Sequence, residues 1–317
     1  MKKSQTDFLA LLVTTDLNPY LLLNPKKKHK MPVELKYNYE ETTAGMDKFN
    51  QKDIDEIKEW TKSLDKEKYV PKDLNDKQLV LFYNSCYGDI EKTKKCIENY
   101  YDCRRNTHEI FNNREFSKED KQALEVIRLS VLPGKSCEGD DIVYFSLYDD
   151  DYTKFHLESV CKLIYMAVDL YLYTRGPQSG YMFVIDTPGV RLMHLTRMNL
   201  SLLSKCSQYL QTALPVRLRA IHMLNANPII DKVMLLMKPF FDKKFMDIIH
   251  FHKKDEDLNL LYKVIPKSSL PSNYGGDHPD VNALHAENTK QLEQLQSYFK
   301  AEEEQRKSFD NRYSSYN

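Results

Sequence analysis

The sequence predicts an α/β fold, in which a mostly parallel β-sheet is flanked by helices and preceded by an all-helical N-terminal bundle. In the first third of the chain, apolar residues recur every three or four positions, which is typical of amphipathic helices. After Pro133 and Gly134, short β-prone apolar runs alternate with helical stretches about as long as a crossover helix. This alternation favours parallel strands with helices packed on the sheet.

Four helices are expected in the first third. Asn50 is a good N-cap residue for the first, and Ser117 with Asp120 forms a capping-box pattern for the fourth. Gly88 and Asp89 mark the turn before the third. The expected helices cover residues 54–64, begin at residue 79, cover residues 90–111, and run from residue 118 to near residue 133.

The rest of the chain is expected to supply the sheet and its covering helices. The expected strands are residues 142–148, 181–186, 219–225 and 247–252, and the helices between them are residues 155–173, 198–214 and 229–241. A last amphipathic helix over residues 288–309 places Leu292, Leu295 and Phe299 on one stripe. Its charged run, AEEEQRK, is therefore expected to be a solvated face.

Composition excludes two classes of protein. The 46 basic and 46 acidic residues give a net charge of zero, which argues against a polycationic nucleic-acid binder. No window approaches the ~18 to 20 apolar residues that cross a bilayer, so an integral membrane protein is not expected. The 6 cysteines are scattered without a CxxC pair, so reduced thiols in the cytosol are expected.

Residues 1–43 are expected to be a disordered extension, because the basic run at residues 26–30 and the polar stretch after it look solvated. The start of the chain imitates a secretory signal, with lysines before the apolar run Phe8–Val13. That run is shorter than the usual ~7 to 15 residues, and no small-residue cleavage site follows it. A true start at Met31 stays open.

Two segments imitate nucleotide-binding motifs without completing them. Residues 134–136 (Gly-Lys-Ser) resemble the end of a phosphate-binding loop, but Leu129 occupies the position where that loop needs a glycine. Residues 186–189 (Asp-Thr-Pro-Gly) have the form of the magnesium-proximal motif of GTPases. Without a phosphate loop, they fit a strand end followed by a turn, and a nucleotide hydrolase ranks far behind the other functions.

Metal binding has two candidate sites, neither of them complete. His250 and His252 lie two apart on an expected strand, so both rings would face one side, but no third or fourth ligand is evident from spacing. The acidic runs at residues 140–141 and 149–151 lack the ordered spacing of an EF-hand loop. No catalytic motif of serine, cysteine or metal hydrolases appears. These patterns therefore give no positive indication of a catalytic or metal site.

The helix expected over residues 229–241 is unusual, because apolar residues occupy nearly all of its sides. A surface helix cannot sustain such a pattern unless something covers it. Two interpretations stay open: an inner core helix, and the lid of an apolar cavity whose ligand supplies the cover. Met234 and Met237 suit the second, since methionine adapts to a surface that repacks.

Three segments carry a family resemblance: LPVRLRAIHMLNANPIIDKVMLLMKPFF (residues 214–241), IIHFH (248–252) and IPKSSLPSNYGG (265–276). They closely resemble the signature of the CRAL-TRIO lipid-binding family, and residues 79–105 look like its N-terminal helical module. The resemblance covers about residues 45–280 and is closest to α-tocopherol transfer protein-like and clavesin-like members common in insects. It implies four parts: an extension over residues 1–43, a helical module over 44–130, a CRAL-TRIO domain over 131–280, and a C-terminal helix and tail over 281–317.

The resemblance implies a non-enzymatic carrier that holds one hydrophobic molecule in an apolar pocket under a mobile lid helix. Such a carrier is expected to be no enzyme and to need no metal or cofactor. The implied lid residues are Ile229, Ile230, Val233, Met234, Leu236, Met237, Phe240 and Phe241. The implied pocket residues are Val160, Leu163, Ile164, Ala167, Tyr181, Phe183, Ile185, Leu210, Val216 and Ile221. The bound molecule would be a tocopherol, a retinoid, another isoprenoid-like lipid or a phospholipid.

Some residues depart from the family pattern. Leu163 and Ala167 stand where tocopherol carriers have serines, which argues against tocopherol recognition by that route. Arg217, Arg219 and Lys244 match a basic cluster that docks on phosphoinositides, with a solvated basic edge as the alternative. Further basic positions are replaced, by Leu81, Asn84, Cys86, Met246 and Ile248.

The expected protein is therefore a soluble, cytoplasmic lipid-transfer protein that visits anionic membrane surfaces transiently. The rival is a phosphoinositide-binding trafficking adaptor with a vestigial cavity, whose acidic C-terminal helix recruits a protein. A sealed, undersized cavity would favour the rival.

Overall fold

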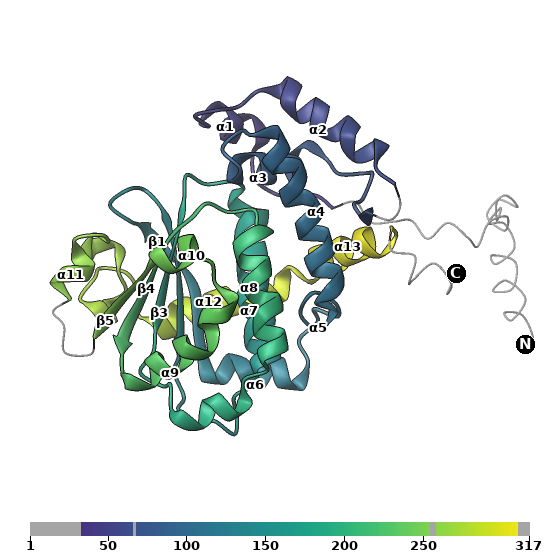
Figure 1. Ribbon diagram of the computed structural model, residues 1–317. Helices are drawn as coiled ribbons and strands as arrows, with labels where there is room; N and C mark the ends of the chain where they lie inside the picture. Colours follow the sequence, from purple (N-terminus) through teal and green to yellow (C-terminus); the bar gives the residue numbers. More distant parts are fainter. Residues whose placement is uncertain (1–32, 66–67, 254–257, 310–317) are drawn as a thin grey trace, which may run out of the picture. The chain divides into compact units, whose positions relative to one another are not determined.

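The computed structural model describes residues 33–65, 68–253 and 258–309. Its β-prone runs form one five-stranded sheet with the strand order β1-β2-β3-β4-β5 (Figure 1). The strands are β1 (Ile127–Lys135), β2 (Asp141–Leu147), β3 (Tyr181–Asp186), β4 (Leu218–Ala226) and β5 (Ile249–Lys253). β1 runs antiparallel to β2, and all later neighbours pair in parallel. The predicted fold class, with its mostly parallel sheet, is confirmed.

Helical crossovers connect the parallel strands. They are α7 (Leu157–Arg175), α8 (Leu200–Thr212), α9 (Pro228–Met237) and α10 (Lys243–Asp247). His156 caps the start of the long helix α7, where its side chain accepts a hydrogen bond from the backbone of Ser159. Gly176, which has a φ of 71°, caps the end of the helix. A positive φ favours glycine at a helix end, so the local sequence fixes this boundary.

Both faces of the sheet are buried, and alternate residues of each strand separate them. On β3, Tyr181 and Phe183 pack with α7 and α8 in one apolar cluster. Met182 and Val184 pack on the other side with α11 (Asn259–Tyr262), the segment that follows it, and α12 (Val281–Gln294). Burial on both sides explains why the strands read as continuous apolar runs.

The N-terminal part is helical, and its caps form as predicted. Its helices are α1 (Tyr39–Ala44), α2 (Gln51–Ser63), α3 (Asp76–Ser85), α4 (Ile90–Asn106), α5 (His108–Phe111) and α6 (Lys118–Val126). Asn50 caps α2, and Ser117 forms a capping box with Asp120 at the start of α6. The turn before α4 places Gly88 in the left-handed region, with a φ of 76°.

Three predicted helix ends are wrong. The fourth helix ends at Val126, because residues 127–135 leave it to pair with β2 as an edge strand. The third breaks at Thr107, where a non-helical backbone conformation (φ −120°, ψ 52°) separates α4 from α5. The last helix is two helices, α12 and α13 (Gln296–Lys307), which meet at Leu295.

The expected disorder of residues 1–43 is wrong for residues 33–43. Val33, Leu35 and Tyr37 are buried, and the hydroxyl of Tyr37 donates to the carbonyl of Lys77 over 2.7 Å. The backbone of Lys36 also donates to the carbonyl of Tyr173 over 2.8 Å. Apolar side chains at every second position anchor this segment despite its polar composition. The signal-like run, the basic run and the start at Met31 lie outside the described residues.

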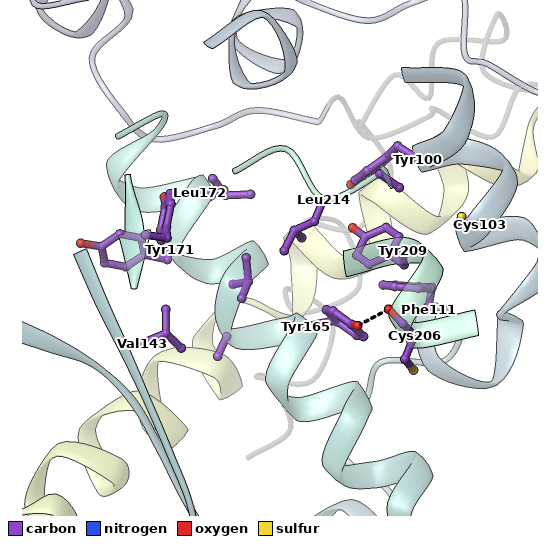
Figure 2. Packing of buried hydrophobic residues seen from close by; sticks show 14 of the residues in the cluster. Tyr100, Cys103, Phe111, Val143, Tyr165, Tyr171, Leu172, Cys206, Tyr209 and Leu214 are labelled. Carbon is purple, nitrogen blue, oxygen red and sulfur yellow. Dashed lines mark hydrogen bonds between the residues drawn. The ribbon is translucent and has the colours of Figure 1, made fainter. Parts of the chain in front are cut away.

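Aromatic packing joins the helical part to the sheet domain (Figure 2). The ring of Tyr209 on α8 lies 4.8 Å from that of Phe111 and 5.0 Å from that of Tyr165 on α7. Tyr165 also donates from its hydroxyl to the carbonyl of Cys206 over 2.9 Å. Such ring pairs contribute about 0.5–1.5 kcal/mol each beyond area burial. The apolar core therefore continues from α4 and α5 into α7 and α8.

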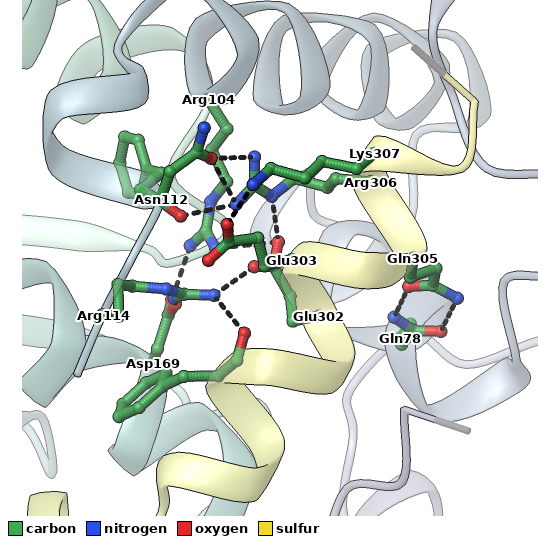
Figure 3. A network of polar contacts seen from close by, with 12 residues as sticks. Gln78, Arg104, Asn112, Arg114, Asp169, Glu302, Glu303, Gln305, Arg306 and Lys307 are labelled. Carbon is green, nitrogen blue, oxygen red and sulfur yellow. Dashed lines mark hydrogen bonds and ion pairs between the residues drawn. The ribbon is translucent and has the colours of Figure 1, made fainter. Parts of the chain in front are cut away.

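A buried ionic network fastens α13 to this core (Figure 3). Arg104 on α4 donates to Asp169 on α7 over 2.6 Å and to Glu302 on α13 over 3.1 Å. Arg114 donates to the same two carboxylates, and Arg306 donates to Glu302 over 2.7 Å. These arginines hold the pKa of the buried Glu302 at about 2, against the opposing effect of burial. The expectation that AEEEQRK is a solvated face is thus wrong for Glu302 and Arg306.

Candidate functional site

The ten predicted pocket residues come together in one apolar cluster between the sheet and its crossover helices. Four lie on α7, three on β3, one on α8, one just before β4 and one on β4. Tyr181, Phe183 and Ile185 occupy alternate positions of β3, so their side chains share one face of the sheet. The structure therefore places these residues together, and their role as a ligand pocket stays a prediction.

The cluster has a closed part and an accessible part. The closed part consists of side chains with almost no exposed surface: Val160, Leu163, Ala167, Tyr181, Phe183 and Ile221. Ile164, Ile185, Leu210 and Val216 are only partly buried. A side chain without accessible area touches no space large enough for water. This holds for Leu163, Ala167 and Tyr181, each at most 1% exposed, whereas Phe183 keeps 9% exposure and the partly buried residues keep more.

The predicted lid is α9, with a short 3₁₀ turn after it (Lys238–Phe240). Asn227 caps the helix, and Pro228 occupies a first-turn position that tolerates proline. Ile230 alone among the α9 residues is buried, at 2% exposure, whereas Leu235 is 72% exposed. Partial exposure of the other apolar side chains shows that α9 is no inner core helix. The interpretation of α9 as an inner core helix is therefore wrong, and its role as the lid of an apolar cavity stays a prediction.

Few polar contacts hold the end of this helical segment. Gln211 on α8 donates to the carbonyl of Phe240 over 2.8 Å and accepts from the backbone of Asp242 over 3.0 Å. Met234 and Phe241 add apolar contacts to the cluster. A segment with few buried contacts opens locally at lower free energy than the core does.

The three predicted docking cations differ in their surroundings. Arg217 donates from Nε to the carbonyl of Asn84 over 2.7 Å, and its guanidinium lies 4.2 Å from the ring centre of Tyr87. Arg219 pairs with the carboxylates of Asp140, at 3.3 Å, and Glu138, at 3.4 Å. Lys244 is exposed on α10. Arg219 is therefore partly neutralised within the fold.

Arg217 also lines a groove of about 530 Å³. Polar side chains dominate its wall, including Asn84, Arg175, Gln178 and Ser179, and the acidic residues Glu41 and Asp47 also line it. Burial lowers the pKa of Arg217, which means that its charge is incompletely compensated. An anionic group entering the groove would compensate it.

The two histidines that suggested a metal pair gain a third partner, His222, which the sequence analysis missed. Strand register places His222 of β4 opposite His250 of β5. Its Nδ1 shares a hydrogen bond of 2.9 Å with Nε2 of His252, and its ring stacks on that of His250 at 5.0 Å. Burial, with the two neighbouring rings, lowers the pKa of His222 to about 4. Within residues 33–65, 68–253 and 258–309, no cluster has a geometry that could hold a metal ion.

The motif at residues 186–189 has a structural role. Asp186 accepts hydrogen bonds from the side chain of Asn225 over 2.7 Å and from the hydroxyl of Tyr274 over 2.5 Å. The same hydroxyl lies 2.9 Å from that of Tyr144 on β2. This buried network attaches the segment around Tyr274, part of LPSNYGG, to the sheet. It explains why a tyrosine occurs in that motif.

The other motif fragments are also accounted for by packing. Gly134 belongs to β1, and a Cβ there would collide with the backbone of Ser269. The acidic run at 149–151 is engaged in ion pairs, with Asp149 at 2.7 Å from Lys154 and Asp150 at 2.8 Å from Arg191. Close packing and charge pairing thus replace phosphate or calcium binding as the reason for these sequences.

Comparison with known proteins gives two domain matches. Residues 126–276 match the family model described as "CRAL/TRIO domain", and residues 47–121 match "Pinta-like, UBA domain". A Homo sapiens protein named "Alpha-tocopherol transfer protein-like" is 28% identical over 204 residues, covering 64% of this chain and 59% of the relative. "Clavesin-1" of Rattus norvegicus is 24% identical over 189 residues, covering 58% of this chain and 52% of the relative.

A solved structure described as "Crystal structure of Sfh5" is 13% identical, with a TM-score of 0.46 over 75% of this chain and 92% of that one. That likeness is too weak to carry an argument. Among the described residues, no helix is both long and apolar enough to cross a bilayer.

The fold and the site define a class of protein, an α/β domain whose apolar layer lies beneath an incompletely covered apolar helix. The chain matches slightly more than half of the length of the relatives named above. Residues 126–276 form a CRAL-TRIO domain, which confirms the resemblance found in the sequence.

Proposed function

We propose that this protein binds one hydrophobic lipid between α9 and the apolar cluster and carries it between membranes. The observation that carries the proposal is the state of α9, whose apolar side chains remain partly exposed on several sides. A lipid beneath the helix would remove part of this surface from water. A few hundred Å² of apolar area corresponds to roughly 10 kcal/mol at ~25 cal/mol per Å², before the costs of binding.

The lipid would lie against the partly buried residues Ile164, Ile185, Leu210 and Val216, with α9 as its cover. The fully buried side chains beneath them would support this surface. Met234 would contact the ligand directly, because it already packs against the cluster from the lid side. The relatives named for α-tocopherol transfer support a tocopherol-like lipid, whereas Leu163 and Ala167 disfavour recognition of a chromanol hydroxyl at their positions. No residue would act as a catalyst.

Loading would be tested by incubating the full chain with a panel of tocopherol, retinoid, sterol and phospholipid, followed by gel filtration and solvent extraction. One lipid retained at near-equal stoichiometry supports the proposal. A protein that retains none of them contradicts it.

Docking of the protein on anionic membranes would use Arg217, Arg219 and Lys244. The polar groove beside Arg217 supports this part, since an anionic headgroup there would compensate the partly buried guanidinium. Reversal of all three charges to Glu is expected to weaken binding to vesicles that contain phosphatidylinositol bisphosphate, by about 1 kcal/mol per charge. Co-sedimentation at low salt measures this, with the exposed Lys300→Glu on α13 as control. Equal binding of the triple variant and wild type would refute the docking site.

The second candidate is a phosphoinositide-binding trafficking adaptor that transfers no ligand. The closed part of the cluster favours it, because Leu163, Ala167 and Tyr181 leave no room around them. The adaptor would bind the same vesicles but retain no lipid from the panel. The loading and sedimentation experiments together separate the two functions.

A further inference from the structure

The groove beside Arg217 collects charges of both signs. Arg175, at the end of α7, and Arg217, just before β4, supply two cations. Glu41, in α1, and Asp47, between α1 and α2, supply two carboxylates. The acids therefore come from the helical part of the chain, the cations come from the sheet domain, and their charges cancel. A ligand that carries only one sign of charge would leave the other sign unmatched.

In the part of the chain that the structure describes, none of these four side chains forms an ion pair. The nearby Arg219, by contrast, pairs with Asp140 at 3.3 Å and with Glu138 at 3.4 Å. Burial lowers the pKa of Arg217, and the charge of Asp47 opposes this effect. Opposite charges thus interact along the groove without touching. A molecule that carries both charges can bridge the gap between them.

Both guanidinium groups of the groove lie over tyrosine rings. Arg217 lies 4.2 Å from the ring centre of Tyr87, and Arg175 lies 5.0 Å from that of Tyr171. A cation held over a ring face uses none of its hydrogen-bond donors on the ring. The donors that remain suit an anion with several acceptor oxygens. Two guanidinium groups on different elements therefore favour phosphate over a carboxylate.

The turn between α3 and α4 positions one of these cations. Tyr87 has a φ of 58°, and its side chain is 55% exposed. The left-handed backbone is unfavourable for a bulky residue, and an exposed ring gains little from burial in return. What the conformation provides is the ring contact with Arg217, whose Nε also donates to the carbonyl of Asn84 over 2.7 Å. The guanidinium is therefore held in place before any ligand arrives.

We propose that the groove binds a phosphate group together with a primary ammonium group on the same molecule. The phosphate accepts hydrogen bonds from Arg217 and Arg175, and the ammonium donates to Glu41 and Asp47. The groove volume of about 530 Å³ lies within the range of small-molecule sites, ~300–1,000 Å³. Ethanolamine phospholipids and free phosphoethanolamine share this chemistry. The lipid as source rests on the proposed docking of the protein on membranes, whereas the chemistry of the groove does not.

The test titrates the full chain with phosphoethanolamine and with ethyl phosphate, which lacks the ammonium group, and follows each ligand by phosphorus NMR. Wild type should bind phosphoethanolamine about fivefold more tightly, because exposed ion pairs contribute modestly. The double variant Glu41→Gln with Asp47→Asn should reduce this ratio to about one. Glu40→Gln is the matched control, because Glu40 shares the first turn of α1 with Glu41 and does not line the groove.

The cation side has its own variants. Arg217→Gln should weaken the binding of both ligands. Tyr87→Leu should also weaken both and leave their ratio unchanged, as expected of a residue that positions the cation. Equal affinities of wild type for the two ligands, or a ratio that the double variant retains, would overturn the proposal. Failure to bind either ligand would also overturn it.

Vesicles identify the source of the ligand. Phosphatidylethanolamine replaces part of the phosphatidylcholine at a constant content of phosphatidylinositol bisphosphate. Co-sedimentation of wild type should increase, and that of the double variant should not, because the choline headgroup has no N–H to donate. No increase, with phosphoethanolamine still bound in the titration, would make the free compound the ligand. A chain that binds no vesicle would refute the docking role of Arg217 and leave the groove site standing.

Discussion

A charge placed on the inner side of α9 is expected to abolish lipid loading, whereas the same charge on its outer side is not. Met234 packs against the apolar cluster, and its neighbour Leu235 is 72% exposed. The pair offers a matched comparison on one helix, Met234→Asp against Leu235→Asp. Both variants carry the same new charge and differ only in the side of the helix that bears it.

The magnitude follows from burial. Met234→Asp removes the apolar contact of one partly buried side chain, about 1 kcal/mol, and places a polar group against an apolar surface, at a further ~2 kcal/mol or more. A total of about 3 kcal/mol corresponds to a weakening of lipid binding by roughly a hundredfold. Leu235→Asp should change binding by less than about 0.5 kcal/mol, as exposed substitutions usually do.

The assay is titration with a fluorescent analogue of whichever lipid the panel identifies, with circular dichroism to confirm that both variants are folded. A folded Met234→Asp variant that binds the lipid as tightly as wild type would refute the assignment of α9 as the cover. Equal losses in both variants would also contradict it, because they would show that the effect does not depend on the side of the helix.

Three further predictions concern stability. Glu302→Gln should lower the free energy of unfolding by about 3 kcal/mol in urea at pH 7, whereas the exposed Glu304→Gln should leave it nearly unchanged. The folded pKa of Glu302, about 2, lies below the usual value. Its contribution to stability is therefore present above pH ~4.3 and is lost as the pH falls toward 2. Equal urea midpoints of the two variants would contradict this. Tyr274→Phe should cost about 1–3 kcal/mol by removing a donor from the buried Asp186, and an unchanged melting temperature would oppose it. The folded pKa of His222 is about 4, so between pH ~6.5 and 4 only the unfolded chain takes up a proton at this residue, and the free energy of unfolding should fall across that range. His222→Gln should flatten this decline, and parallel pH profiles of the variant and wild type would refute the prediction.

The sheet and most helices were predictable because their signals are local. Alternation on β3 assigned Tyr181 and Phe183 to one face, and the caps at Asn50 and Ser117 marked true helix starts. Residues 127–133 were assigned to a helix because they continue an apolar pattern that fits either structure. Their pairing with β2 decides the outcome, and that partner lies beyond any local window.

The residues of the candidate site were predictable to a similar extent as the fold. All-round apolarity singled out α9, and the resemblance placed ten residues that the fold gathers in one cluster. The split between closed and accessible members was not predictable, since it depends on packing among several elements. The contact of His222 with the two strand histidines could have been predicted, because the parallel register places His222 opposite His250. The network of Arg104, Asp169 and Glu302 could not be predicted, because Asp169 and Glu302 lie 65 and 198 positions from Arg104 in the sequence.

The central claim is that the space beneath α9 holds one lipid molecule. Native mass spectrometry of the protein purified from its source tissue, combined with solvent extraction, tests it most directly. The account predicts one hydrophobic molecule per chain, which a Met234→Asp variant no longer retains. A protein that is persistently empty, and that no lipid in the panel can load, would contradict it and favour the membrane-docking adaptor.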